Sequence, residues 1–370
     1  MYNGFDLDLT KTKMAHISLY WVETGASMTK EIKSAAEIKA NNVATIKRAL
    51  LDMKTATKPE VAEKTKLSVV TCGTILNELT ANGTIVEESL RLSSGGRPAM
   101  SYRFSENIGY ALCLYTYTDG DCSYIRYQIL DVFGNILDSK AIQEKSITIP
   151  TLINHIQEIR KPYTRIKVIV LGVQGCINKD IIEFTDLPEL SGHNLKKEIE
   201  EATGIFTRVH NDMKTVALGF SKISPEIKNG NADEHLENNI ALLFFPQGRT
   251  PAGSFIVDGH ILRGSSNLAG ELSFFPFSVE KEKLPEIFSS LEKAQSYVDR
   301  LFVATTVFLD PAVIFVTGGL SNWMNAEKIV STLQERLNRS QLPKIIIQPR
   351  AEVEYFAGLY SIAVDHLLGA

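Results

Sequence analysis

From residue 108 onward, the chain alternates between apolar stretches typical of β-strands and amphipathic stretches typical of α-helices. The stretches "IKVIVLGVQG" (166–175) and "AVIFVTGGLS" (312–321) predict buried strands that end in glycine turns, whereas "NLKKEIEEATG" (194–204) and residues 291–311 predict helices. The alternation occurs in two successive halves. This pattern restricts the fold to the α/β class and predicts α/β layers that are repeated in two halves.

The composition indicates a folded protein with more than one core. A chain of 370 residues fits two or three packed units, and 44% hydrophobic with 22% charged residues is ordinary for globular proteins. No apolar run approaches the roughly 20 residues that span a bilayer. The first residues contain no apolar signal-peptide core. We therefore expect a cytoplasmic protein that does not bind membranes.

The four cysteines lie far apart in the sequence, at Cys72, Cys113, Cys122 and Cys176, and form no C-x-x-C pair. This spacing argues against a disulfide framework and against a thiolate zinc site. We expect free thiols, no metal site and no cofactor.

The net charge of −4 is unevenly distributed along the chain. Residues 29–104 contain 12 Lys and Arg against 8 Asp and Glu, which gives +4, whereas residues 105–370 carry −7. A basic front segment on an acidic body suggests that only the front segment has a polyanion as partner.

Three short helices are expected in this front segment. Apolar residues repeat at helical spacing between Ile38 and Met53, and Thr57 with Glu60 forms a capping-box pattern. Ser68 suits the N-cap of the third helix, which Asn82-Gly83 ends. This arrangement predicts a helix-turn-helix whose third helix reads the major groove of DNA. The candidate DNA-binding residues at its start and on its outer face are Ser68, Val69, Val70, Thr71, Thr74 and Asn77.

A glycine and a hairpin complete the predicted DNA-binding unit. Gly73 lies within the third helix and permits close approach either of DNA or of a neighbouring helix. Residues 85–104 then alternate like a hairpin around "SSGGRP". Such a wing rests on the phosphate backbone, and Arg97 is placed to enter a minor groove. We interpret residues 29–105 as a winged helix-turn-helix domain and assign no role to the arm 1–28.

The stretch "AGELSFFPF" (269–277) places Glu271 just after an Ala-Gly turn. Such a turn often aims a carboxylate into a small-molecule cleft. Three phenylalanines follow, which either fill that cleft or belong to an ordinary core. The residues by themselves do not decide whether the acid assists a reaction or holds a ligand.

The order of these motifs resembles the ROK family of repressors and sugar kinases, which has a two-lobed, actin-like ATPase fold. The resemblance covers residue 38 to the C-terminus. It is carried by the winged helix ending in "GGRP", by "VHNDMKTVALG" (209–219), by "DGHILRGSSNLAGEL" (258–272) and by "LDPAVIFVTGGLS" (309–321).

The resemblance implies a set of ligand-binding residues. The Asn-Asp pair that binds sugar hydroxyls in the kinases corresponds to Asn211 and Asp212, and the Asp is their general base. The sugar-binding carboxylate of the Ala-Gly-Glu turn corresponds to Glu271. Gly175 and His193 match positions that border the sugar cleft. The histidine that binds sugar and zinc in the kinases is replaced by Phe274.

The elements that hold Mg·ATP in the kinases depart from the family pattern. Tyr115 and Tyr117 occupy positions that need an acid and a small residue. The second phosphate loop, "FPQGRTPAGS" (245–254), contains two prolines that lack an N–H group. Arg249 within it is expected to be solvated. Because phosphoryl transfer depends on positioning and charge neutralisation, we expect no catalytic residues and no enzymatic activity.

The leading hypothesis is a transcriptional regulator that acts as a repressor. Residues 29–105 would bind a double-stranded DNA operator, and residues 106–370 would sense a sugar or sugar phosphate and form a homodimer or higher homo-oligomer. Two alternatives remain: an active ATP-dependent sugar kinase with a DNA-binding head, and a ligand-free regulator whose body serves only for oligomerisation. The sequence does not identify the effector.

Overall fold

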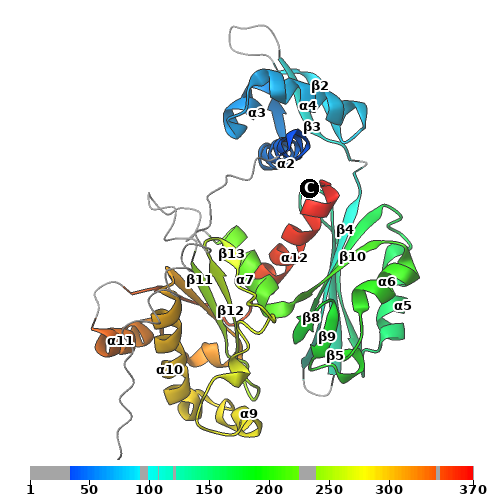
Figure 1. Cartoon of the computed structure of the whole chain (residues 1–370). Helices are drawn as coiled ribbons and strands as arrows, with labels where there is room; N and C mark the ends of the chain where they lie inside the picture. Colours follow the sequence, from blue (N-terminus) through cyan, green and yellow to red (C-terminus); the bar gives the residue numbers. More distant parts are fainter. Residues whose placement is uncertain are drawn as a thin grey trace, which may run out of the picture.

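The computed structural model describes residues 34–91, 99–106, 108–119, 122–224, 239–338 and 342–369. A small head sits above a body of two lobes, and the last helix runs between the lobes toward the head (Figure 1). The predicted α/β fold with an N-terminal helical unit is confirmed. The arm 1–28 and Arg97 lie outside the described residues.

The head contains three helices and a small antiparallel sheet. The order of strands in the sheet is β1-β3-β2. The elements are α2 (Ala35–Met53), β1 (Thr55–Thr57), α3 (Lys58–Thr65), α4 (Val69–Ala81), β2 (Ile85–Arg91) and β3 (Ala99–Phe104). The expected caps are present, because the Glu60 carboxylate accepts from the Thr57 N–H at 2.7 Å and Ser68 Oγ accepts from the Thr71 N–H at 3.0 Å. The strand β1 was not predicted, since three residues are too few for a periodic pattern.

The first lobe is built on a five-stranded sheet with the order β10-β7-β4-β5-β6. The first half of its chain forms β4 (Tyr110–Asp119), β5 (Cys122–Leu130), β6 (Ile136–Glu144), α5 (Ile149–Arg160) and β7 (Ile166–Val173). The second half forms β8 (Cys176–Asn178), β9 (Ile181–Phe184), α6 (Leu195–Thr203), β10 (Phe206–Asn211) and α7 (Asp212–Ile223). One face of the sheet packs on α5 and α6, and the other packs on α7 and the last helix.

The second lobe repeats this plan with the strand order β13-β12-β11-β14-β15. Its strands are β11 (Ile240–Phe244), β12 (Ala252–Val257), β13 (His260–Ile261), β14 (Val313–Thr317) and β15 (Lys344–Ile347). Its helices are α9 (Leu284–Ile287), α10 (Leu291–Leu309), α11 (Ala326–Leu337) and α12 (Glu352–Leu367). The outer face of this sheet packs on α10 and α11, whereas its inner face packs on α7 and α12.

Helices α7 and α12 therefore form a layer between the two sheets, and they cross in direct backbone contact. A Cβ atom on Gly219 of α7 would lie 1.7 Å from the Glu354 carbonyl oxygen, and one on Gly358 of α12 would lie 2.0 Å from the Thr215 carbonyl oxygen. No side chain fits at either position. The crossing fixes α7, which begins at the cleft described below, against the helix that reaches the head.

The head packs on the C-terminal end of α12. Val364 and Leu368 belong to the same hydrophobic cluster as the head residues Ile46 and Leu50. Lys47 of α2 is buried and donates a hydrogen bond to the Leu368 carbonyl. A cation at a helix C-terminus is favourable because the carbonyls there carry partial negative charge. Within the described parts of the chain, no helix is both long enough and apolar enough to cross a membrane.

Candidate functional site

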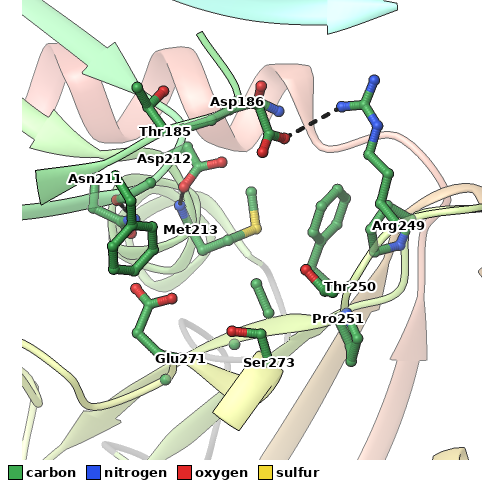
Figure 2. Close-up of a pocket in the computed structure, with 18 of the residues that line it drawn as sticks. Thr185, Asp186, Asn211, Asp212, Met213, Arg249, Thr250, Pro251, Glu271 and Ser273 are labelled. Atoms are coloured by element: carbon green, nitrogen blue, oxygen red, sulfur yellow. Dashed lines mark hydrogen bonds and ion pairs between the residues drawn. The ribbon is translucent and has the colours of Figure 1, made fainter. Parts of the chain in front are cut away.

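A cleft of about 540 Å³ opens between the two lobes. Figure 2 shows Asn211 and Asp212 at the start of α7, with Asp186 beside them and Glu271 across from them. Arg249 and Thr250 of the β11–β12 turn form another wall. The volume is in the range of small-molecule sites. The structure thus brings residues that are distant in sequence to one cleft.

Asn211 lines the cleft and also stabilises the start of α7. It is the N-cap of α7, where its Oδ1 accepts from the Lys214 N–H at 2.9 Å and its Nδ2 donates to the Gly175 carbonyl at 2.7 Å. Both ends of the amide are therefore engaged within the protein. Asn211 holds the start of α7 against the glycine turn after β7.

Asp212 is buried and lines the cleft. Its Oδ1 accepts a hydrogen bond from the Met213 N–H at 2.7 Å. Burial, assisted by the negative charges of Glu271 and Asp186, raises the pKa of Asp212 to about 7. Near neutral pH this carboxyl group can either donate a hydrogen bond to a ligand hydroxyl or accept one from it.

Glu271 is positioned by the turn before it. Gly270 has φ +94°, and a Cβ atom there would lie 2.2 Å from the Gly253 carbonyl oxygen, so the turn requires glycine. Burial raises the pKa of Glu271, whereas the charges of Lys214 and Lys281 act in the opposite direction. The acid that follows the Ala-Gly turn therefore lies in the cleft, beside two cations.

The glycine turn after β7 forms the floor beside Asn211. Gly175 has φ +114°, and a Cβ atom there would lie 2.0 Å from the Phe184 carbonyl oxygen. It therefore contributes backbone to the cleft. The Oε1 atom of its neighbour Gln174 is buried and has no hydrogen-bond partner among the described residues. Because buried polar groups are normally paired, we expect water or a ligand to donate to it.

Other residues that the sequence analysis associated with the cleft lie outside it. His193 lies in the loop before α6, does not line the cleft, and contacts Glu198 with 3.1 Å between Nδ1 and Oε1. The three phenylalanines do not fill the cleft either. Phe274 is 55% exposed and packs edge-on to Phe184, and Phe277 is buried in the core of the second lobe, with which Phe275 also packs.

In the second phosphate loop (245–254), the glycine amides form hydrogen bonds within the protein. The Gly248 N–H donates to the Phe288 carbonyl at 2.9 Å, and the Gly253 N–H donates to the Gly270 carbonyl at 2.8 Å. Pro246 and Pro251 have no N–H to offer. Neither glycine therefore presents a free amide to a phosphate group.

The expectation that Arg249 is solvated was wrong. Its Nη2 donates to the Thr118 carbonyl at 3.0 Å, and its Nη1 lies 3.5 Å from Asp186 Oδ2 (Figure 2). Arg249 thus joins the β11–β12 turn of the second lobe to the ends of β4 and β9 in the first. Sequence reasoning missed this contact because its partners lie 131 and 63 positions away.

Tyr115 is the residue for which the family resemblance predicts an acid in the kinases. It is buried and stacks on Tyr355 of α12, with ring centroids 4.3 Å apart and an interplanar angle of 20°. Phe356 packs against the same ring at 5.3 Å. Burial raises the pKa of Tyr115 far above neutrality, so it stays uncharged and supplies no ligand for a magnesium ion. Among the described residues, no cluster of His, Cys, Asp and Glu is arranged to hold a metal ion.

The outer face of α4 presents the side chains expected at DNA. Val69 and Val70 in its first turn are 52% and 79% exposed, and Thr74 and Asn77 are exposed one and two turns further on. Asn77 Oδ1 accepts from Lys58 Nζ at 3.3 Å. Ser68 and Thr71 are engaged with each other at the helix start, 2.8 Å apart through their hydroxyl oxygens.

Comparison with known proteins shows which family part of the body is similar to. Residues 119–283 match the model of the ROK family. The chain carries a ROK family domain. It is 23% identical over 249 residues to a protein named "Putative xylose repressor" from Caldicellulosiruptor sp. (strain Rt8B.4), an alignment that covers 64% of this chain and 59% of that protein. The chain thus spans about three fifths of the length of that relative.

Solved structures show the same fold. A ROK family transcriptional regulator, a homologue of the E. coli MLC protein, superposes with a TM-score of 0.67 at 17% identity and covers 90% of this chain and 98% of its own. A ROK family protein from Streptococcus pneumoniae TIGR4, solved with sucrose, superposes with a TM-score of 0.52 at 15% identity over 70% of this chain and 99% of its own. The fold of the first structure extends over head and body, whereas that of the second matches a smaller part of this chain.

Proposed function

We propose that this protein is a transcriptional regulator that binds DNA through its head and a sugar in its interlobe cleft. The observation that carries the proposal is the contrast between the two halves of the cleft. Asp212 and Glu271 remain available to hydroxyl groups, whereas the glycine amides of the phosphate loop are already paired. The cleft is thus suited to bind a sugar and poorly suited to transfer a phosphoryl group to it.

The ligand class follows from the polar groups of the cleft. The two carboxyl groups of Asp212 and Glu271 offer acceptors for several hydroxyl groups. Gly175 would shape the cleft through its backbone. Asn211 uses one N–H and one lone pair of its amide within the protein and would offer its second N–H to a ligand. The relative named as a xylose repressor makes xylose the first sugar to test.

The exposed face of α4 supports the DNA-binding part of the proposal. Val70 and Thr74 can contact thymine methyl groups, and the Asn77 side chain can pair with adenine. We also propose that Arg97 of the wing enters the minor groove. The head would end at residue 105 and the body would begin at residue 106. A two-fold homodimer would present two such heads and would select an inverted repeat.

Communication between the sites would run through α7 and α12. Asp212 is the first residue of α7, α7 crosses α12 at Gly219 and Gly358, and the far end of α12 accepts the hydrogen bond from Lys47 of the head. A sugar that prefers one arrangement of the lobes would shift α7, and α12 would pass the shift to the head. This coupling makes the protein a sugar-responsive repressor in our proposal.

A second candidate function is sugar phosphorylation, and one observation favours it. A pKa of about 7 suits Asp212 to remove a proton from a sugar hydroxyl near neutral pH. The paired glycine amides and the Tyr115–Tyr355 stack oppose it. Release of ADP from Mg·ATP in the presence of xylose, glucose and N-acetylmannosamine tests this alternative; sustained turnover would replace the regulator by a kinase.

The proposed function is tested by selection from a random duplex library with the purified full-length chain at fixed, near-physiological salt. We expect an inverted repeat to be enriched. Asn77→Ala should weaken binding to that repeat roughly 5- to 150-fold, since a bidentate contact to a base contributes about 1–3 kcal/mol. The control Asn41→Ala removes the same side chain from an exposed position of α2 and should bind normally. Folded protein that enriches no sequence would refute the proposal.

A further inference from the structure

A second pocket, of about 320 Å³, lies on another face of α7 from the sugar cleft. Asp212 and Met213 line the cleft, whereas Lys214, Thr215 and Leu218 line the second pocket. Successive residues of a helix turn by 100°, so these two sets face different directions. We call this cavity the basic pocket, because its lining includes the charged or imidazole side chains of Lys179, Asp180, Arg208, His210, Lys214 and Arg263.

Three segments from both lobes bring positive charge to the basic pocket. Lys179 comes from the β8–β9 turn, Arg208 from β10, and Arg263 from the loop after β13 in the second lobe. Lys214 on α7 is the fourth cation of the lining, and its Nζ donates to the Asn267 carbonyl at 2.9 Å. Charges of one sign repel one another unless an opposite charge lies among them.

The protein supplies little negative charge to balance these cations. The single carboxylate of the lining, Asp180, lies 3.6 Å from Lys196 outside the pocket. Within the described residues, Lys179, Arg208 and Arg263 form no ion pair. Lys214 differs from these three, because burial lowers its pKa whereas the negative charge of Glu271 in the neighbouring cleft acts in the opposite direction. The uncompensated charge is therefore concentrated on Lys179 and the two arginines.

His210 lines the basic pocket together with these arginines and is partly buried. Arg208 and His210 are two positions apart on β10 and so point to the same side of the strand. Burial, together with the charges of Arg263 and Arg208, lowers the pKa of His210 to about 4, although Asp180 acts in the opposite direction. The imidazole is therefore neutral at pH 7 and offers one N–H donor and one acceptor nitrogen.

We propose that the basic pocket binds a small organic phosphate, with Arg208 and Arg263 holding the phosphate group and His210 donating to it. Guanidinium groups match phosphate oxygens in geometry and charge, and a dianion offsets the excess of cations. The volume of the pocket suits a ligand of about the size of a triose phosphate. This site adjoins the sugar cleft, with which it shares only Asn211 of the two linings, and would give the regulator of our proposal a second, phosphorylated effector.

Isothermal titration calorimetry of the full-length chain at pH 7.5 and constant ionic strength tests the proposal without DNA or sugar. The probes are glycerol 3-phosphate, inorganic phosphate and malate. We expect glycerol 3-phosphate to bind more tightly than the other two. Arg263→Gln and Arg208→Gln should each weaken its binding at least tenfold, whereas Arg336→Gln on the exposed surface of α11 should not change it.

The histidine provides an independent readout. A bound phosphate should raise the pKa of His210, which NMR titration of the imidazole resonances measures against the other histidines. Equal affinity for malate, binding of inorganic phosphate alone, or equal weakening by Arg336→Gln would each overturn the proposal. So would the absence of both heat and a shift at His210. These outcomes are independent of whether the sugar cleft controls DNA binding.

Discussion

At the scale of single residues, sugar binding depends on which polar side chains of the cleft can still form hydrogen bonds with a ligand. Asn211 and Arg249 make hydrogen bonds to other parts of the protein, whereas the carboxyl groups of Asp212 and Glu271 line the cleft. The sequence predicted the identity of the acids through a family motif. It could not predict that the Asn211 amide caps α7, nor that Arg249 bridges the lobes, because both depend on contacts that only the folded chain creates.

Asp212→Asn should change how the stability of the protein depends on pH. The pKa of Asp212 is raised from 3.8 to about 7 in the folded chain, so between these values the folded state binds more protons than the unfolded state. The free energy of unfolding therefore falls as pH rises from about 4 to about 7 and changes no further above that. Asn does not titrate and can still accept from the Met213 N–H.

The variant should accordingly match the parent near pH 4 and exceed its stability at pH 8 by on the order of 2–4 kcal/mol. Thermal unfolding followed by circular dichroism from pH 4 to pH 8 measures the difference. If the parent and the variant respond identically to pH, Asp212 does not carry a raised pKa.

At the scale of elements, local sequence signals predicted the helices of the head well and the tertiary contacts poorly. The caps at Thr57 and Ser68 occur where predicted, because capping uses residues within three positions of one another. The short strand β1, the crossing of α7 and α12, and the stack of Tyr115 on Tyr355 have no local signal. Each of them joins segments that are distant in the chain.

Gly73→Ala tests why a glycine lies in the recognition helix. A Cβ atom at Gly73 would meet only the Lys58 side chain at 3.8 Å, an ordinary contact, so no packing within the head requires glycine. The substitution should stabilise the head by about 0.5–1 kcal/mol, since alanine favours the helix. If the glycine admits the DNA backbone, affinity for the selected operator should fall at least tenfold in the same variant.

Thermal unfolding and fluorescence anisotropy measure these two effects. A gain in stability together with a loss of DNA affinity excludes a folding defect as the cause of the weaker binding. Unchanged affinity would show that DNA does not approach this position.

At the scale of the whole molecule, control of DNA binding by a sugar requires a structural connection between the cleft and the head. The body forms five layers, with α7 and α12 between two sheets and further helices outside each sheet. Among the residues that the structure describes, the head packs on the C-terminal end of α12 and on neighbouring residues of the first lobe. A shift in the middle layer is therefore the direct route by which a ligand in the cleft would alter the head (Figure 1).

Lys47→Met should weaken this connection while preserving most of the packing. The substitution removes the donor to the Leu368 carbonyl but keeps an unbranched apolar stem of similar length. Leaving a buried carbonyl unpaired costs about 1–3 kcal/mol. We expect DNA binding to persist and the ratio of operator affinities without and with sugar to fall toward one. Lys145→Met, at an exposed position of the first lobe, should leave that ratio unchanged.

The most direct test of the central claim is the operator affinity of the full-length chain, measured by fluorescence anisotropy with and without xylose and a panel of related sugars. The account predicts that one sugar weakens operator binding at least tenfold. It also predicts that Glu271→Gln binds the operator normally but loses the response to that sugar, whereas Glu327→Gln on α11 responds like the parent. An operator affinity that no sugar alters, or a response that survives in Glu271→Gln, would contradict it.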